Sequence, residues 1–235
     1  KELGHWAVYW TTGGVAKDFN VYLGSTNNRI VKVPFGGWDE AGLPRYDIGT
    51  AAVVARMPDG RHEFGAIAVD PDTAQIFTVA EANGWRWGNQ KPGLYSFRAD
   101  GSLAWRIAGN EDLRPMGNIN GECVMGPVES GGEAGKIVAT TQWHGLHVPL
   151  ITTDGIFIGR VLRDPAAGGD PGPDMFRGEC IQYLNRLDDG RVILAHGKNA
   201  HHLFQITGLE TAKRFAQALV VTPADAERAA QGLRE

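Results

Sequence analysis

Five of the seven histidines fall in two short segments in the second half of the chain. Residues 142–147 read QWHGLH and residues 196–202 read HGKNAHH. A Gly-Glu-Cys phrase occurs twice, 57 residues apart, and contributes Glu122 and Glu179. Imidazole and carboxylate groups bind divalent metals and exchange protons near neutral pH. The pattern therefore indicates a metal site or an acid–base centre, provided that the fold brings these segments together.

The metal hypothesis draws its ligands from both histidine segments and from the repeated phrase. The candidate ligands are Glu122, Glu179, His144, His147, His196 and His201. Strand side chains alternate between faces, so we expect His201 rather than its neighbour His202 to face the site. The ions considered are zinc, manganese, iron and calcium. The spacing matches no standard metal motif, and the alternative that these side chains hydrogen-bond loop backbone stays open.

A second candidate ligand is carbohydrate. Residues 81–90 read EANGWRWGNQ, and we expect Asn83, Trp85 and Trp87 to form a sugar-binding platform that Trp143 extends. Flat aromatic faces pack on the C–H surfaces of sugars, while amide and guanidinium groups bind hydroxyls. Arg114 would bind the carboxylate of an acidic sugar. In the alternative interpretation, the tryptophans cover a neighbouring sheet.

Catalysis is a further possibility. His144 or His196 would serve as general base while Arg177 or a metal neutralises a uronate carboxylate, which is the chemistry of a polysaccharide lyase. Hydrolysis by a metal-activated water is the other option. Arg177 and Arg114 could instead pair with the two glutamates of the repeated phrase. Whether the protein is an enzyme stays open.

The repeated phrase also predicts the fold. Its glycine has fainter echoes at Gly65 and Gly4, and self-similarity at a fixed period is typical of repeat architectures. Each repeat reads as four short strands rich in Val, Ile, Phe and Thr, separated by Asp-Gly or Pro-Asp turns. The pattern predicts an all-β β-propeller of about four four-stranded blades. The predicted blades span residues 1–60, 61–108, 109–163 and 164–222, and a short C-terminal helical tail follows at 223–235.

Within these repeats, the alternation and the turns predict individual strands. For the first repeat they are Trp6–Trp10, Phe19–Leu23, Arg29–Val33 and Ala51–Arg56; for the second, Ala66–Val69, Gln75–Ala80, Leu94–Phe97 and Leu103–Ile107. For the third they are Glu122–Val128, Lys136–Thr141, His147–Thr152 and Ile156–Val161; for the fourth, Cys180–Leu187, Arg191–Ala195, His202–Ile206 and Ala216–Val221. The cysteines of the repeated phrase would be small buried residues of inner strands, and a disulfide between them stays an alternative.

The blade texture, for example GAIAVDPDTAQIFTVAEANGWRWGNQKPGLYSFRADGSLAWRIAG, resembles secreted bacterial β-propellers of the loose NHL-like or gluconolactonase-like superfamily. The resemblance implies a fold rather than an activity. Four blades make either a small closed propeller or part of a larger one. A non-catalytic interaction module, completed by another protein chain, is therefore the alternative function.

Composition limits the partners. The net charge is −4, and no cluster of Lys and Arg indicates nucleic acid. No apolar run is long enough to cross a bilayer, so no membrane partner is expected. The chain starts at Lys1, inside an expected strand, so either a leader has been removed or a longer protein has been cut, and both alternatives stay open. We expect an extracytoplasmic protein, periplasmic or secreted.

Overall fold

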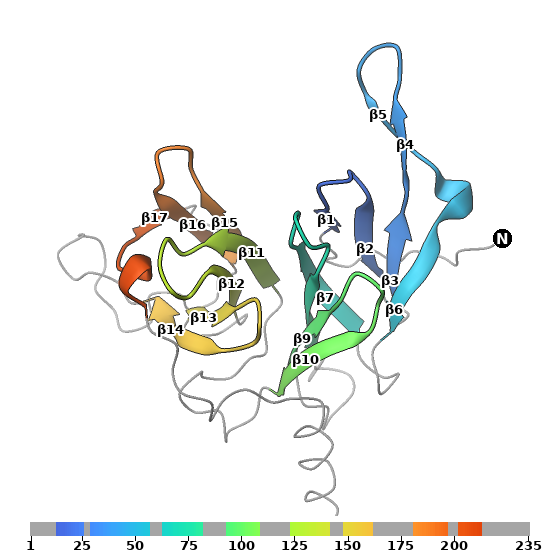
Figure 1. Ribbon diagram of the computed structural model, residues 1–235. Helices are drawn as coiled ribbons and strands as arrows, with labels where there is room; N and C mark the ends of the chain where they lie inside the picture. The colour runs from blue at the N-terminus through green and yellow to red at the C-terminus, as the bar shows by residue number, and fades with distance from the viewer. Residues whose placement is uncertain are drawn as a thin grey trace, which may run out of the picture.

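The described part of the protein is built from consecutive antiparallel β-sheets (Figure 1). The computed structural model describes residues 13–25, 29–56, 63–81, 93–108, 123–141, 148–161, 181–196 and 202–212. Within these ranges the only helical segments are two 3-10 turns, Ile48–Thr50 and Leu209–Thr211. Three sheets have four strands each and a fourth sheet has three. The predicted all-β fold of four-stranded blades is confirmed.

Each sheet is one blade, and its strands follow one another in chain order. Blade 1 contains β1 (Gly13–Val15), β2 (Val21–Ser25), β3 (Arg29–Val33) and β6 (Ala52–Arg56); blade 2 contains β7 (Glu63–Val69), β8 (Ile76–Glu81), β9 (Gly93–Phe97) and β10 (Leu103–Ala108). Blade 3 contains β11 (Cys123–Glu129), β12 (Lys136–Thr141), β13 (Val148–Thr152) and β14 (Phe157–Val161); blade 4 contains β15 (Ile181–Arg186), β16 (Val192–His196) and β17 (His202–Ile206). The predicted strand Ala216–Val221, the C-terminal helix and the boundaries near residues 60, 109, 163 and 222 lie outside the described residues.

The blades stack through their first strands. Strand β7 contacts β1 and β2 on one side and β11 on the other, and β11 in turn contacts β15. Blades 1 and 2 lie on the right of Figure 1 and blades 3 and 4 on the left. The first strand of each blade is therefore the inner one, as in a propeller.

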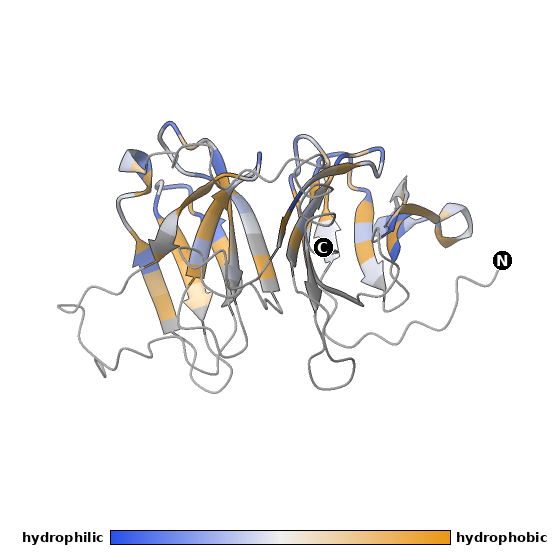
Figure 2. Ribbon diagram, turned by 90° about the horizontal axis from the view of Figure 1, so that it is seen from below, coloured by the Kyte–Doolittle hydropathy of each residue, from blue (hydrophilic) through white to orange (hydrophobic). Residues whose placement is uncertain are grey.

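The hydrophobic core consists of layers between neighbouring blades. Consecutive residues of one strand point to opposite faces, so Ile76 packs toward blade 1 and Phe77 toward blade 3. In blade 3, Ile151 faces blade 2 whereas Leu150 faces blade 4. The middle blades are thus apolar on both faces, and Figure 2 shows hydrophobic segments, in orange, along the strands of the sheets. Full burial of each such side chain contributes about 1.5–3 kcal/mol.

The two ends of the blades differ. At one end the strands are joined by short turns, and Gly101, Gly155 and Gly190 take the positive φ expected of Asp-Gly turns, at +85°, +91° and +87°. We call this end the tight-turn face. At the other end lie the starts of the inner strands and the strand ends that flank five connections outside the described residues, 82–92, 109–122, 142–147, 162–180 and 197–201. We call that end the long-connection face.

Blade 1 differs from the prediction in two respects. Its inner strand is β1 at Gly13–Val15, whereas the predicted strand Trp6–Trp10 lies outside the described residues. Phe19, expected in a strand, lies in the β1–β2 turn at a φ of +61°. That turn forms because the Ala16 N–H donates to the Asn20 carbonyl and the Asp18 carboxylate accepts from the Asn20 N–H. Local hydrogen bonding has outweighed the strand preference of phenylalanine.

Blade 1 also carries an insertion that the sequence did not predict. Between β3 and β6, strands β4 (Phe35–Trp38) and β5 (Pro44–Tyr46) form a separate hairpin that projects at the top right of Figure 1. The Asp39 carboxylate shapes its tip by accepting hydrogen bonds from the Ala41 and Leu43 N–H groups, at 2.9 and 2.8 Å. Gly36, Gly37 and Pro44 made this segment resemble a loop, because glycine and proline disfavour strands.

Candidate functional site

Most predicted site residues lie outside the described residues. These are Asn83, Trp85, Trp87, Arg114, Glu122, Trp143, His144, His147, Arg177, Glu179 and His201. The exception is His196, the last residue of β16, whose backbone pairs with Ile181 of β15 and His202 of β17. The site predicted from sequence therefore stays a prediction. The described strands show only where the connections that carry its residues leave and rejoin the blades.

Those strand ends lie together. In blade 3, Cys123 at the start of β11 pairs with Thr141 at the end of β12. In blade 4, Ile181 at the start of β15 pairs with His196 at the end of β16. Since β11 contacts β15, both pairs lie at the same edge of adjacent blades. The four connections that carry the predicted glutamates and histidines start and finish at this edge, the long-connection face.

No metal site is formed by the part of the chain that the structure describes. Within it, no three His, Cys, Asp or Glu side chains lie close enough to hold an ion. The described residues also contain no helix that is long and apolar enough to span a bilayer. Apart from His196, the predicted metal ligands lie outside the described residues, so the metal hypothesis is a proposal about the long-connection face alone.

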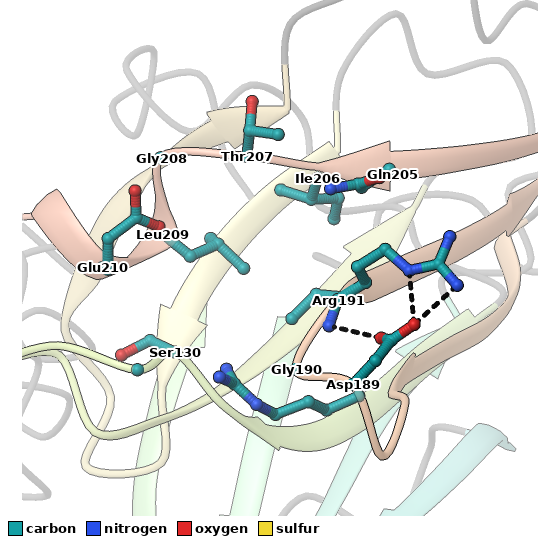
Figure 3. Close-up of a pocket in the computed structure, with 13 residues that line it drawn as sticks. Ser130, Asp189, Gly190, Arg191, Gln205, Ile206, Thr207, Gly208, Leu209 and Glu210 are labelled. Atoms are coloured by element: carbon teal, nitrogen blue, oxygen red, sulfur yellow. Dashed lines mark hydrogen bonds and ion pairs between the residues drawn. The ribbon is translucent and has the colours of Figure 1, made fainter.

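The described residues do form a hollow on the tight-turn face, between blades 3 and 4 (Figure 3). It has a volume of about 450 Å³, and its wall combines the β11–β12 turn, the β15–β16 turn and the 3-10 turn after β17. Arg186 bridges the two blades, because its Nη1 donates to the Glu129 carbonyl at 3.0 Å. Sequence analysis missed this hollow because its lining comes from three turns that are far apart in the chain.

Opposite charges balance one another in this hollow. The Arg191 Nε donates to Asp189 Oδ2 at 2.7 Å, the pair drawn with dashed lines in Figure 3. This hydrogen bond lowers the pKa of the Asp189 carboxyl below its ordinary value. Glu210 lines the hollow as well as Arg186. The lining is thus two cations and two anions, which suits a joint between blades better than a site for a charged ligand.

A buried ion pair joins blades 2 and 3 on the same face. The Lys136 Nζ lies 2.7 Å from Asp70 Oδ1 and 2.6 Å from Asp72 Oδ2. Partial burial lowers the pKa of Lys136, but the hydrogen bonds to both carboxylates outweigh this effect and raise it overall. The hydrogen bond from Lys136 likewise lowers the pKa of Asp72. These groups are committed to holding two blades together and are not free for chemistry.

The tight-turn face also carries an exposed aromatic cluster. The rings of Phe19, Phe35 and Trp38 contact one another with centroids 5.1–5.3 Å apart. Trp38 is 52% exposed and Phe19 is 45% exposed. The sequence signal was present in the two aromatics that flank Gly36-Gly37, but its meaning depends on the hairpin and on the contact with a distant turn.

Comparisons with known proteins give structural likeness only. No protein-family model matches the chain, and no curated protein matches it. A protein of unknown function from Bacteroides caccae is similar in structure at 12% identity, over 87% of this chain and 58% of that one, with a TM-score of 0.45. A catalytically inactive virginiamycin B lyase from Staphylococcus aureus, with quinupristin, is similar at 12% identity, over 87% and 57%, with a TM-score of 0.49.

A third similar structure is the Dos1 propeller, at 10% identity, over 90% of this chain and 49% of that chain, with a TM-score of 0.43. The chain thus spans less than two thirds of the length of each of these proteins. At identities this low, structural similarity indicates the fold alone. The fold is assigned here from the blades described above. The chain is a β-propeller-type protein of consecutive four-stranded blades.

Proposed function

We propose that the protein is a ligand-binding β-propeller whose long-connection face binds an acidic carbohydrate together with a divalent metal ion. One observation supports this most directly. The paired strand ends Cys123–Thr141 and Ile181–His196 lie on adjacent blades, so the histidine-bearing and glutamate-bearing connections leave from one edge. Ligands supplied by several loops above a rigid scaffold are the common design of binding and catalytic sites.

The chemistry of these residues suits an acidic sugar. In this scheme Glu122 and Glu179 would hold the metal together with histidines other than His144, and Arg177 or the metal would neutralise the carboxylate of a uronate. A neutral His144 would then accept the proton next to that carboxylate, the electron pair of the broken C–H bond would form a double bond in the sugar, and the glycosidic oxygen would leave with a proton taken from water. This lyase reaction needs one base and one positive group, and the proposed site offers both.

Substitution of the histidines tests the proposal. We expect the double variant His144→Ala/His196→Ala to lose bound metal and to bind an oligogalacturonate at least about tenfold more weakly, since each lost ligand or hydrogen bond contributes 1 kcal/mol or more. Metal content is measured by mass spectrometry and glycan binding by calorimetry. His62→Ala, outside both histidine segments, is the matched control. Unchanged metal content and glycan affinity in a folded double variant would refute the proposal.

A second function, that of a non-catalytic assembly module, is favoured by the outer faces of the end blades. Leu203 of blade 4 is 74% exposed and Val53 of blade 1 is 36% exposed. An apolar blade face commonly packs on another blade, so a second protein chain could continue the stack. Size measurement by light scattering separates the two functions, because Leu203→Glu should disrupt an assembly and leave a carbohydrate-binding monomer unchanged.

A further inference from the structure

The most unusual surface of the described chain is the aromatic cluster on the projecting hairpin. The ring centroids of Phe19 and Trp38 are 5.3 Å apart, with an interplanar angle of 76°. Those of Phe35 and Trp38 are 5.2 Å apart, with an interplanar angle of 69°. Tyr46 extends the cluster beneath Phe35 at 6.1 Å. Edge-to-face contacts of this kind fix ring orientation. Trp38 and Phe19 are therefore held rigidly although about half of each side chain is open to water.

The backbone takes two special conformations to present these rings. The pairing of β4 with β5 shifts between Phe35 and Trp38, where Gly37 has a φ of +101°. This irregularity brings residues 35 and 38, which regular alternation would point to opposite faces, into contact with one ring. Phe19 itself has a φ of +61°, a conformation in which glycine or asparagine is usual and a bulky aromatic is an outlier. A strained residue of this kind often marks a functional position.

Hydrogen bonds hold this arrangement in place. The Phe35 N–H donates to Asn20 Oδ1 at 2.9 Å, which joins the hairpin to the β1–β2 turn. The Phe19 N–H donates to the Ala16 carbonyl at 2.8 Å. The rings thus belong to two separate segments that one asparagine holds together. This platform is preorganised before any ligand arrives, which lowers the entropic cost of binding.

We infer that Phe19 and Trp38 form a carbohydrate-binding platform on the tight-turn face, separate from the site proposed above. Two half-exposed aromatic side chains offer about 200 Å² of apolar surface. A stable protein interface needs about 800 Å² from each partner, so the platform is too small for one. A purely apolar ligand would need a concave pocket that covers most of its surface. A sugar ring, with one apolar face and hydroxyls that remain in water, fits an open platform.

Polar groups flank the two exposed rings. Asp18 precedes Phe19 and Asp39 follows Trp38, and both carboxylates lie in turns that fix their positions. Carboxylates accept hydrogen bonds from sugar hydroxyls. The two carboxylates would repel the negative charge of a uronate, so they favour a neutral sugar.

Calorimetric titration with neutral hexasaccharides tests the inference. The probes are β-1,4-linked hexamers of glucose, xylose, mannose and N-acetylglucosamine, added in the presence of EDTA. We expect wild type to bind at least one of them, Trp38→Ala to weaken that binding about tenfold or more, and Phe19→Gly to weaken it about fivefold. Phe19→Gly removes the positive-φ strain, so the folded state should persist while affinity falls. Thermal melts verify that each variant is folded.

Two matched controls separate ring contact from general damage. Among the described residues, Ala74 in the β7–β8 turn is the other non-glycine residue with a positive φ, +56°, and Ala74→Gly relieves it. Leu43→Ala removes an exposed apolar side chain from the tip of the same hairpin. Both should bind the glycan within about twofold of wild type, because neither side chain belongs to the ring cluster.

The outcomes distinguish this inference from the proposed function. If wild type binds none of the neutral hexamers, or if Trp38→Ala and Phe19→Gly bind like wild type, the platform is refuted while metal-dependent binding at the long-connection face stands. If Trp85→Ala/Trp87→Ala abolishes neutral glycan binding instead, the sugar belongs to the long-connection face. Self-association that only Trp38→Ala removes would assign the rings to a protein interface and would also overturn the inference.

Discussion

At the scale of single residues, glycine decides how closely the tight turns approach the next blade. Gly101 has a φ of +85°, and a Cβ placed there would lie 1.6 Å from the Val54 carbonyl oxygen of β6. Likewise, a Cβ placed on Gly155 would lie 2.9 Å from the nearest atom of the Trp105 ring. Two constraints therefore apply to Gly101 at once, a left-handed backbone and direct contact with another chain segment. No side chain satisfies both.

We expect Gly101→Ala to reduce the free energy of unfolding by at least about 3 kcal/mol, because left-handed strain adds to a backbone overlap. Urea denaturation measures the change. Gly135→Ala is the control, since Gly135 has a φ of +65° but nothing within 4 Å of its would-be Cβ. The free energy of unfolding of that variant should fall by only about 1–2 kcal/mol, the cost of a left-handed backbone at a non-glycine residue. Equal losses in the two variants would show that the contact with Val54 does not matter.

At the scale of elements, polar contacts between turns reinforce the apolar layers between blades. The Lys17 N–H donates to the Pro71 carbonyl between blades 1 and 2, and Arg186 donates to the Glu129 carbonyl between blades 3 and 4. Between blades 2 and 3, Lys136 bonds Asp70, a carboxylate only 2% exposed. Of these three contacts, loss of the Lys136–Asp70 contact would reduce the free energy of unfolding most, because the buried Asp70 charge would be left unpaired.

We therefore expect Lys136→Met to lower the free energy of unfolding by about 2–3 kcal/mol, as the buried Asp70 carboxylate loses its cation. The methionine keeps most of the packing of the lysine stem, so the loss reports the charge. Lys17→Met is the matched control, because Lys17 and Asp72 form an exposed pair at 3.7 Å. It should change stability by less than about 0.5 kcal/mol, measured by the same urea titration. An unchanged free energy of unfolding in Lys136→Met would show that the buried Asp70 carboxylate does not depend on this cation.

The sequence predicted those elements whose local patterns agree with their tertiary role. Strands β12 and β17 match their predicted bounds, because each has a short apolar segment bounded by polar residues or glycine. Strand β1, Gly-Gly-Val, was missed because glycine carries no strand signal, although Gly14 is needed where a Cβ would meet Val69 at 2.3 Å. The aromatic cluster was missed for another reason: Phe19 and Trp38 meet only after two distant segments have folded.

At the scale of the whole molecule, the blade stack separates structural from ligand-binding tasks. The tight-turn face holds the ion pairs and the close turns, and the long-connection face collects the strand ends that flank the histidine-bearing segments. This division follows from antiparallel order, since every inner strand runs in the same direction along the stack. Changes at one face should therefore leave the other face intact, which is why the two proposed sites can be tested separately.

The tight-turn face also carries three carboxyl groups whose pKa values link the stability of the protein to acid. Hydrogen bonds from Lys136, Ser102 and Arg191 lower the pKa values of Asp72, Asp100 and Asp189, respectively, below the ordinary 3.8. In the acid range the unfolded chain then binds more protons than the folded chain, so stability rises with pH. The stabilisation is complete above pH 3.8 and is lost as the pH falls through the lower folded-state pKa values.

We accordingly expect the urea midpoint of wild type to be constant between about pH 5 and 7 and to fall steadily below about pH 4. The urea midpoint of the double variant Asp100→Asn/Asp189→Asn should fall less steeply with decreasing pH, because an amide keeps the turn geometry but has no proton to gain. At basic pH the Lys136 ion pairs have the opposite pH dependence. The raised pKa of Lys136 gives stabilisation that is complete below the ordinary value of 10.5 and is lost as the pH rises through the higher folded-state pKa. A wild-type midpoint that is the same at pH 3 and pH 5, or a double variant with an unchanged slope, would show that these turn carboxylates do not couple protonation to folding.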